Sequence, residues 1–223
     1  MSARRPPPTP RWLGRVPYPE ALEAQRAHRA RMLAGAADEE LWGLEHEPVV
    51  TRGRRGTEDG LDVAALAARG VPQVQTERGG RTTWHGPGQL VVYTLVHVHA
   101  RGHGPASFVE ALEEGVVRWL AGLGLAAGRR DGHPGVWRGA DKLCAVGLHI
   151  SGGVAMHGLA LNLCPDLSTY ALFTPCGIED GGVSSVERVL GAAPRPVDAF
   201  PGLAAELIAA ITASIQPREE SSR

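Results

Sequence analysis

Two neighbouring β segments joined by a pair of glycines restrict the fold of this chain more than any other feature. Residues 142–150 alternate their side chains as a strand does, and residues 154–163 form a second β-rich segment. Gly152 and Gly153 stand between them, as is typical of a tight turn. The sequence therefore predicts an antiparallel hairpin, around which a larger sheet can be built.

The alternation within residues 142–150 gives one lysine an unusual position. One face of the predicted strand carries Leu143, Ala145, Gly147 and His149. The opposite face carries Lys142, Cys144, Val146, Leu148 and Ile150. Because the second set is apolar except for its first member, we expect Lys142 at the strand start, on the core-facing side. The alternative is an exposed lysine at a strand end, since most lysine side chains are exposed.

Apolar periodicity predicts further elements on either side of the hairpin. The predicted helices span 19–34, 61–69, 106–121, 183–190 and 201–215, and Ser107 and Ser184 or Ser185 are candidate caps. The predicted strands span 40–50, 71–77 and 90–97. The resulting class is α/β (α+β), a mixed and largely antiparallel sheet flanked by helices. We expect an extended proline-rich arm over residues 1–17, a single domain over 18–215 and a disordered tail over 216–223.

A glycine-rich segment joins two of the predicted strands. It runs Arg78-Gly79-Gly80-Arg81-Thr82-Thr83-Trp84-His85-Gly86-Pro87-Gly88-Gln89. Glycine loses conformational entropy on folding and packs no side chain, so four of them between strands indicate close backbone approach to a ligand. The alternative is a long hairpin turn.

A cysteine between two turn-forming residues is the candidate nucleophile. Cys176 follows Pro175 and precedes Gly177, which predicts a sharp bend that presents the thiol. A lysine in apolar surroundings gives up its proton more readily, so Lys142 could generate the reactive thiolate. His85 and His157, each followed by a glycine, are further candidates. The alternatives are an ordinary cysteine-containing turn and hydrogen-bonded core histidines.

Composition excludes several classes of function. A net charge of −1 argues against nucleic acid as the main partner. However, Arg52, Arg54 and Arg55 of a local basic loop, together with Arg78 and Arg81, form a basic patch that could steer an acidic protein. The alternative for that loop is a solvated surface. Three widely spaced cysteines indicate a reducing, cytoplasmic compartment, with Cys144 and Cys164 as small buried residues. No local zinc motif and no apolar run of about 20 residues is present, so we expect neither a metal cofactor nor a membrane span.

Three separated motifs resemble one enzyme family. Arg78-Gly79-Gly80-x-x-Thr83-x-His85-Gly86-Pro87-Gly88-Gln89 resembles the signature of the octanoyl-[acyl carrier protein]:protein N-octanoyltransferases of lipoate biosynthesis. Lys142-x-x-x-x-Gly147 followed by His157-Gly158-Leu159-Ala160-Leu161-Asn162 is similar to the next block, and Pro175-Cys176-Gly177 to the last. The resemblance covers about residues 16–190. His149 and Trp84 depart from the usual arginine and tyrosine, which leaves the shape of the acyl pocket open.

The resemblance implies a fold like the catalytic domain of biotin and lipoate protein ligases, and an octanoyl transfer through a Cys176 thioester with Lys142 as the base. It implies no cofactor. The implied donor is octanoyl-acyl carrier protein, and the implied acceptors are lipoyl domains of 2-oxoacid dehydrogenase complexes and the glycine cleavage H protein. The substrate-binding residues that it implies are Arg78, Gly79, Gly80, Thr83, His85, Gly86, Gly147, His157, Gly158, Ala160 and Asn162.

Simple chemistry adds two expectations to this scheme. An acyl chain needs an apolar channel, for which Val91, Tyr93, Val146 and Leu161 are candidate walls. A tetrahedral intermediate needs donors for its oxyanion, for which the Gly79-Gly80 and His157-Gly158 amides or the Lys142 ammonium are candidates. Two alternatives remain: an ATP-dependent lipoate or biotin-type ligase, and a non-catalytic acyl-binding protein of the same fold.

Overall fold

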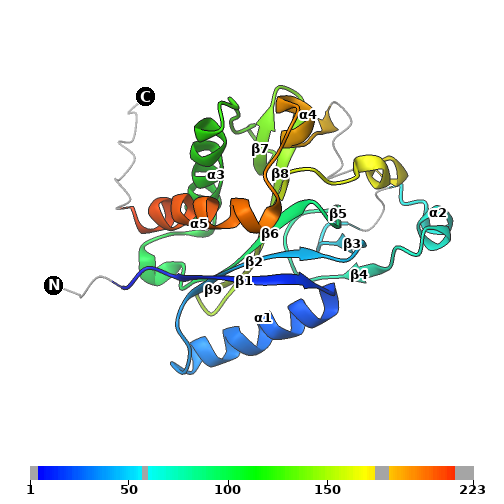
Figure 1. Cartoon of the computed structure of the whole chain (residues 1–223). Helices are drawn as coiled ribbons and strands as arrows, with labels where there is room; N and C mark the ends of the chain where they lie inside the picture. Colours follow the sequence, from blue (N-terminus) through cyan, green and yellow to red (C-terminus); the bar gives the residue numbers. More distant parts are fainter. Residues whose placement is uncertain (1–4, 57–59, 174–180, 214–223) are drawn as a thin grey trace, which may run out of the picture.

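A mixed, mostly antiparallel sheet forms the centre of the protein (Figure 1). The computed structural model describes residues 5–56, 60–173 and 181–213. The sheet order is β1-β2-β6-β9-β8-β10, with β7 paired to β8. Its strands are β1 (Thr9–Val16), β2 (Glu40–His46), β6 (Gln89–Leu95), β7 (Gly135–Arg138), β8 (Asp141–Ser151), β9 (Val154–Asn162) and β10 (Gly182–Val183). Within this sheet, only the β1–β2 and β8–β10 pairs are parallel among the described strands.

A second, smaller sheet has the order β4-β3-β5. It consists of β3 (Val49–Arg52), β4 (Gln73–Gln75) and β5 (Thr82–His85). The helices are α1 (Tyr18–Leu33), α2 (Val63–Ala68), α3 (Pro105–Gly122), α4 (Val186–Leu190) and α5 (Pro196–Thr212), with 3-10 turns at His99–Arg101 and Leu167–Leu172. The predicted fold class is therefore confirmed.

The two faces of the large sheet are covered by different helices (Figure 1). On one face, α3 and α5 bury residues such as Phe108, Leu112 and Leu203 against strand residues that include Leu161 and Leu143. On the other face, α1 buries an apolar stripe against β2, β6 and β9. This stripe contains Tyr18, Ala21, Leu22 and Met32. Such two-sided burial explains why the central strands are apolar on both faces.

The predicted hairpin is confirmed as β8 and β9, which pair antiparallel from Cys144–Leu161 to Ser151–Val154. The predicted alternation of side chains, however, fails at the start of β8. A register irregularity opposite Val136 and Trp137 interrupts the ladder with β7. As a result Leu143 and Cys144, which were expected on opposite faces, are both fully buried in the α3–α5 core.

Several predicted boundaries change for identifiable reasons. Residues 40–50 form two strands in different sheets, while β5 and β7 lie in segments predicted as loops. The last helix begins at Pro196 rather than at Pro201, which lies inside it. Burial of Ala199 and Phe200 against the core stabilises this extra turn despite the hydrogen bond that Pro201 removes. Ser185 caps α4 through the amide of Arg188, as one of the two predicted caps.

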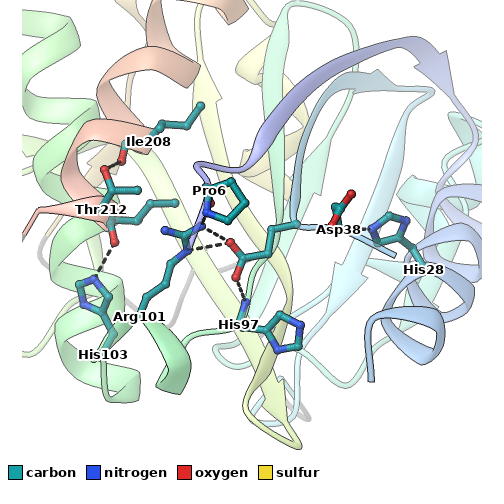
Figure 2. A network of polar contacts seen from close by, with 10 residues as sticks. Pro6, His28, Asp38, His97, Arg101, His103, Ile208 and Thr212 are labelled. Carbon is teal, nitrogen blue, oxygen red and sulfur yellow. Dashed lines mark hydrogen bonds and ion pairs between the residues drawn. The ribbon is translucent and has the colours of Figure 1, made fainter. Parts of the chain in front are cut away.

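The N-terminal segment belongs to the sheet over most of its described length. Residues 9–16, predicted as part of a separate extended arm, form the edge strand β1 paired to β2. Figure 2 shows how the residues before β1 are held: the buried Arg101 guanidinium bonds both the Glu39 carboxylate and the Pro6 carbonyl. Glu39 also accepts the amide of His97 at 2.9 Å. No helix in the described part of the chain has the length and apolar character needed to cross a membrane.

Candidate active site

A cavity lies on the α1 face of the large sheet, where it meets the small sheet. It encloses about 510 Å³ of empty space, part of which is open to solvent. Strands β6, β8 and β9 provide one wall, and the segment from Arg78 to His85 provides another. The lining residues are Tyr18, Arg78, Gly80, Arg81, Thr83, His85, Val91, Tyr93, Lys142, Ala145, Val146, Gly147, His157, Gly158, Leu159 and Ala160.

Most of the predicted site residues meet at this cavity. Eight of the predicted substrate-binding residues line it together with Lys142: Arg78, Gly80, Thr83, His85, Gly147, His157, Gly158 and Ala160. Asn162 lines a small adjoining pocket that also includes Lys142, and Gly79 lines a wider neighbouring groove. Gly86 is placed differently, beneath the ring of Trp84, where a Cβ atom would overlap the indole. Cys176 lies outside the described residues.

Three of the four residues predicted as channel walls lie at this cavity. Val91, Tyr93 and Val146 line the cavity. Leu161 faces the α3–α5 core instead, where it is fully buried. The other two cysteines are not candidates for the nucleophile, because burial raises the pKa of Cys144 to about 12 and also raises that of Cys164.

Lys142 is buried, as predicted, and its side chain is held from several directions. Only 7% of its surface is exposed. Its Nζ atom donates to the Pro134 carbonyl at 3.2 Å and lies 4.6 Å from the ring centroid of Trp137. A carbonyl oxygen and the face of an indole both attract an ammonium group. The side chain is therefore positioned at one end of the cavity rather than left to move in solvent.

The start of β7 fits closely around this lysine. Gly135 has a φ of +131°, and a Cβ atom there would overlap the Cys144 carbonyl and lie 3.3 Å from Lys142 Cε. Its amide donates to Glu113 Oε1 of α3 at 2.7 Å. Burial raises the pKa of Glu113, whereas the Gly135 amide and Arg129 oppose this shift. Helix α3 thus fixes the backbone that contacts Lys142.

His157 has the most unusual backbone conformation in the site. Its φ is +60°, which is uncommon for any residue other than glycine and is concentrated at functional sites. Its amide donates to Gln25 Oε1 at 2.8 Å, which stabilises this conformation. Burial lowers the pKa of its imidazole to about 4, so the ring is neutral at pH 7. Among the described residues neither ring nitrogen has a hydrogen-bond partner, so the ring can bond to a group in the cavity.

A second neutral histidine sits behind the cavity wall. Burial lowers the pKa of His46 to about 4. Its Nδ1 lies 2.7 Å from the Val16 carbonyl, so this nitrogen carries the proton, and Nε2 accepts from Tyr93 Oη at 2.6 Å. Burial raises the pKa of Tyr93 well above 10, so the phenol stays protonated. The Tyr93 ring is thereby fixed in the wall.

His85 belongs to a chain of buried hydrogen bonds that links the two sheets. Its Nδ1 donates to Gln89 Oε1 at 2.7 Å, and Gln89 Nε2 donates to Asn162 Oδ1 at 2.9 Å. Asn162 Nδ2 donates in turn to the Ser184 carbonyl at 3.0 Å. Burial and nearby positive groups lower the pKa of His85 well below 6.5. Since every member is buried, this chain gives His85 and Asn162 a positioning role.

Arg78 is a buried residue that stabilises the glycine-rich segment, and it is not a surface charge. It is 7% exposed, and its guanidinium donates to the Thr51 carbonyl at 2.6 Å and to Thr51 Oγ1 at 2.8 Å. A further bond of 3.0 Å reaches the Gly79 carbonyl. The expectation that Arg78 belongs to a surface basic patch is therefore wrong, because its charge is used inside the fold.

Two of the candidate oxyanion donors are already occupied. The Gly79 amide donates to the Leu148 carbonyl at 2.8 Å, and the His157 amide donates to Gln25. Neither can turn to a reacting oxygen without losing its present partner. Of the original set, the Lys142 ammonium and the amides of Gly80 and Gly158, which all line the cavity, remain as candidates.

Sequence reasoning missed three residues of the site: Tyr18, Trp137 and Glu113. Tyr18 begins α1 and stacks on His85, with ring centroids 5.9 Å apart. Trp137 and Glu113 contact the surroundings of Lys142 from a short strand and from the long helix. The only signal available was Glu113, an acidic residue inside the apolar stripe of residues 106–121. The sequence does not indicate which group this carboxylate contacts.

Comparison with known proteins identifies the family. The model of the lipoyl protein ligase A/B catalytic domain matches residues 17–208. An octanoyltransferase of Chloroflexus aurantiacus is 43% identical over 220 residues, covering 96% of this chain and 97% of the relative. An octanoyltransferase of Alkaliphilus metalliredigens is 41% identical over 189 residues, covering 83% of this chain and 85% of the relative.

Solved structures agree with this at the level of fold. A chain from the structure of a bi-partite lipoate protein ligase and its E2 lipoyl domain from Thermoplasma acidophilum superposes with a TM-score of 0.69 at 15% identity. That match covers 93% of this chain and 84% of the other. Biotin protein ligase from Aquifex aeolicus gives a TM-score of 0.56 at 12% identity, covering 91% and 70%. The chain belongs to the lipoyl protein ligase A/B catalytic-domain family, in which its similar relatives are octanoyltransferases.

Proposed function

We propose that this enzyme moves an octanoyl group from octanoyl-acyl carrier protein to a lysine of apo lipoyl domains, the first step of endogenous protein lipoylation. The observation that carries the proposal is a buried lysine at one end of a largely apolar cavity, in a chain 43% identical to an octanoyltransferase. The cavity and Lys142 supply binding and proton transfer. Cys176 supplies the covalent attachment, as the family motif implies.

The first step exchanges one thioester for another. Lys142 accepts the Cys176 thiol proton, and the thiolate sulfur attacks the carbonyl carbon of the donor thioester. A tetrahedral intermediate forms, and the Lys142 ammonium stabilises its oxyanion. The bond to the carrier sulfur then breaks, and the departing thiolate takes the proton from Lys142. The products are an octanoyl-Cys176 thioester and a free carrier thiol.

The second step converts the thioester into an amide. The neutral ε-amine of the acceptor lysine attacks the acyl carbon, and Lys142 accepts the proton that the amine loses. The bond between the acyl carbon and the Cys176 sulfur breaks as the tetrahedral intermediate collapses. The cysteine leaves as a thiolate and is protonated again, so the enzyme returns to its initial state without ATP or a cofactor.

The lining of the cavity suits the acyl chain. Val91, Ala145 and Ala160 give it apolar walls from three adjacent strands. Burying about six methylene groups at roughly 0.8 kcal/mol each would contribute about 5 kcal/mol of binding. The fixed Tyr93 ring adds a rigid surface, so little side-chain entropy is lost when the chain enters.

The proposed partners are acidic domains that carry either the donor or the acceptor. Arg54, Arg55 and Arg81 are exposed on the loops beside the cavity and could steer them, whereas the buried Arg78 could not. The acceptors would be lipoyl domains of 2-oxoacid dehydrogenase complexes and the glycine cleavage H protein. A cytoplasmic location, where thiols remain reduced, fits an enzyme that depends on a free cysteine.

The decisive experiment is mass spectrometry of the protein after incubation with octanoyl-acyl carrier protein in the absence of ATP. We expect the mass of one octanoyl group on the peptide that contains Cys176, and its transfer to an apo lipoyl domain added afterwards. Cys176→Ser should abolish the thioester, and Lys142→Gln should slow its formation by about 10²- to 10⁴-fold.

Cys164→Ser is the matched control, because Cys164 is only half-buried but is not part of the proposed chemistry. An absolute requirement for ATP, with no adduct on Cys176, would instead indicate a ligase that forms an acyl-adenylate. Full activity of the Cys176→Ser variant would also contradict the proposal.

A further inference from the structure

A groove wider than the acyl cavity begins at the same lysine. The two spaces share Gly80, Arg81, Lys142, Val146 and Gly147, so they adjoin at these residues. The groove has about 1320 Å³ of empty space, part of it open solvent. Its other lining residues come from the loop at Arg55, the glycine-rich segment, the start of α3, the segment before β7, and β8: Arg55, Gly79, Pro105, Val109, Gly132, His133, Pro134, Leu148 and Ile150.

The groove combines an apolar floor with a positively charged rim. Val146, Leu148 and Ile150 of β8 form the floor and are only half-buried. Arg55 and Arg81 are exposed at the rim. None of the described lining residues is acidic, so the potential in the groove is positive. Such a surface suits a thin, uncharged chain that ends in an anion.

We infer that this groove holds the arm on which the acyl donor is carried, a pantetheine chain with its phosphodiester at Arg55 and Arg81. The inference rests on the proposed function, which puts the donor thioester beside Lys142. From that point the acyl chain would enter the cavity and the arm would extend along the groove. The amide-containing arm would lie over the β8 floor, and its phosphate would reach the rim.

Charge favours the donor arm over the acceptor lysine as the occupant. In water the acceptor side chain is an ammonium ion, which a groove with two exposed arginines repels. A phosphate makes charge-assisted hydrogen bonds to guanidinium groups, often in pairs. The acceptor therefore approaches Lys142 from another direction, after the donor arm has left.

The test compares two donors that lack the carrier protein, octanoyl-pantetheine and octanoyl-4′-phosphopantetheine. These small donors remove any steering by a protein surface and differ only in the phosphate. For the wild type we expect kcat/KM for enzyme acylation to be about tenfold higher with the phosphorylated donor, because the phosphate adds charge-assisted hydrogen bonds to guanidinium groups. Arg55→Glu should remove this preference, and Arg55→Gln should reduce it.

Arg54→Glu is the matched control, because Arg54 is the exposed neighbour of Arg55 and does not line the groove. It should retain the preference for the phosphorylated donor. The groove assignment would be overturned if both donors acylated the wild type equally well, or if the Arg54 and Arg55 variants lost the preference for the phosphorylated donor to the same extent. Neither result would contradict the proposed octanoyl transfer. If no donor acylates the enzyme, octanoyl-acyl carrier protein included, both the proposed function and the assignment of the groove to the donor arm would be overturned.

Discussion

The ammonium nitrogen of Lys142 lies 4.6 Å from the ring centroid of Trp137, whose own Nε1 donates to the His133 carbonyl at 3.0 Å. The indole is thus locked in place and presents its face to the lysine. In the proposed reaction Lys142 must reach first a thiol and then an amine, so its position limits both steps. Trp137 is accordingly a positioning residue.

Trp137→Leu should lower kcat for octanoyl transfer by about tenfold, because a desolvated cation–π contact is worth roughly 1–2 kcal/mol. Trp137→Phe keeps an aromatic face and should lose less. KM for the donor should change little in both. Steady-state kinetics together with urea unfolding would check this, and equal losses of kcat in the two variants would contradict the positioning role.

Glu113 gives a second prediction, because its carboxylate accepts the Gly135 amide at 2.7 Å. Glu113→Gln retains an acceptor oxygen, whereas Glu113→Ala leaves a buried amide without a partner at a cost of about 1–3 kcal/mol. Because burial raises the pKa of Glu113, the folded state holds this proton more tightly than the unfolded chain. The stability that Glu113 contributes is therefore present at low pH and is lost as pH rises through its raised pKa.

The stability of Glu113→Gln relative to the wild type should then be higher at pH 8 than at pH 4.5. Glu113→Ala should be less stable than the wild type at both pH values and should have a lower kcat. Urea midpoints at the two pH values and kcat at the higher one would measure this. Glu114→Gln is the control, since the neighbouring carboxylate is only half-buried and pairs with Arg118 and Arg129. Identical behaviour of the Gln and Ala variants at position 113 would contradict the account.

The central hairpin could be predicted because it depends on local signals. Residues 142–150 alternate, Gly152 and Gly153 turn the chain, and β9 follows at once. Strands β5 and β7 could not be predicted, because each has only four residues among turn-forming neighbours. Each owes its conformation to pairing with another strand, β3 for β5 and β8 for β7. The irregularity at Leu143 has the same origin, since it depends on β7.

Site residues could be predicted where they are glycines or histidines, which are unusual within a strand. They could not be predicted where their role depends on contacts between elements that are distant in the sequence. His157 and Gly158 stand out within an otherwise apolar segment, and they line the cavity. Tyr18 and Trp137 resemble ordinary apolar residues in the sequence. Their roles arise only when α1 packs on the sheet and β7 pairs with β8.

Gly158 provides a third prediction, which concerns packing alone. A Cβ atom at this position would overlap the Val92 carbonyl oxygen of β6, which is backbone and cannot swing away. Gly158→Ala should therefore lower the free energy of unfolding by about 1–3 kcal/mol or more. Gly122→Ala is the matched control, because nothing lies within 4 Å of its Cβ position at the end of α3. It should be neutral or stabilising by up to about 1 kcal/mol, so similar urea midpoints for both variants would contradict the predicted overlap.

The buried histidines make stability depend steeply on pH. Burial lowers the pKa of His46 and His157 to about 4 and that of His85 well below 6.5. Between pH 6.5 and 4 the unfolded chain binds protons at these sites that the folded chain cannot bind. The stability of the fold is therefore full above about pH 6.5 and decreases as pH falls toward 4, by at most about 4 kcal/mol per pH unit for three such groups.

His157→Asn should reduce this pH dependence by about a third, since one proton-binding site is removed and asparagine tolerates the positive φ. Urea unfolding at pH 7.5, 6 and 5 would measure the slope, and His99→Gln is the control because His99 is exposed. A wild-type midpoint that stays constant from pH 7.5 to 5 would mean that the folded chain can bind these protons. An equal reduction in the His99 variant would mean that burial of His157 is not the cause.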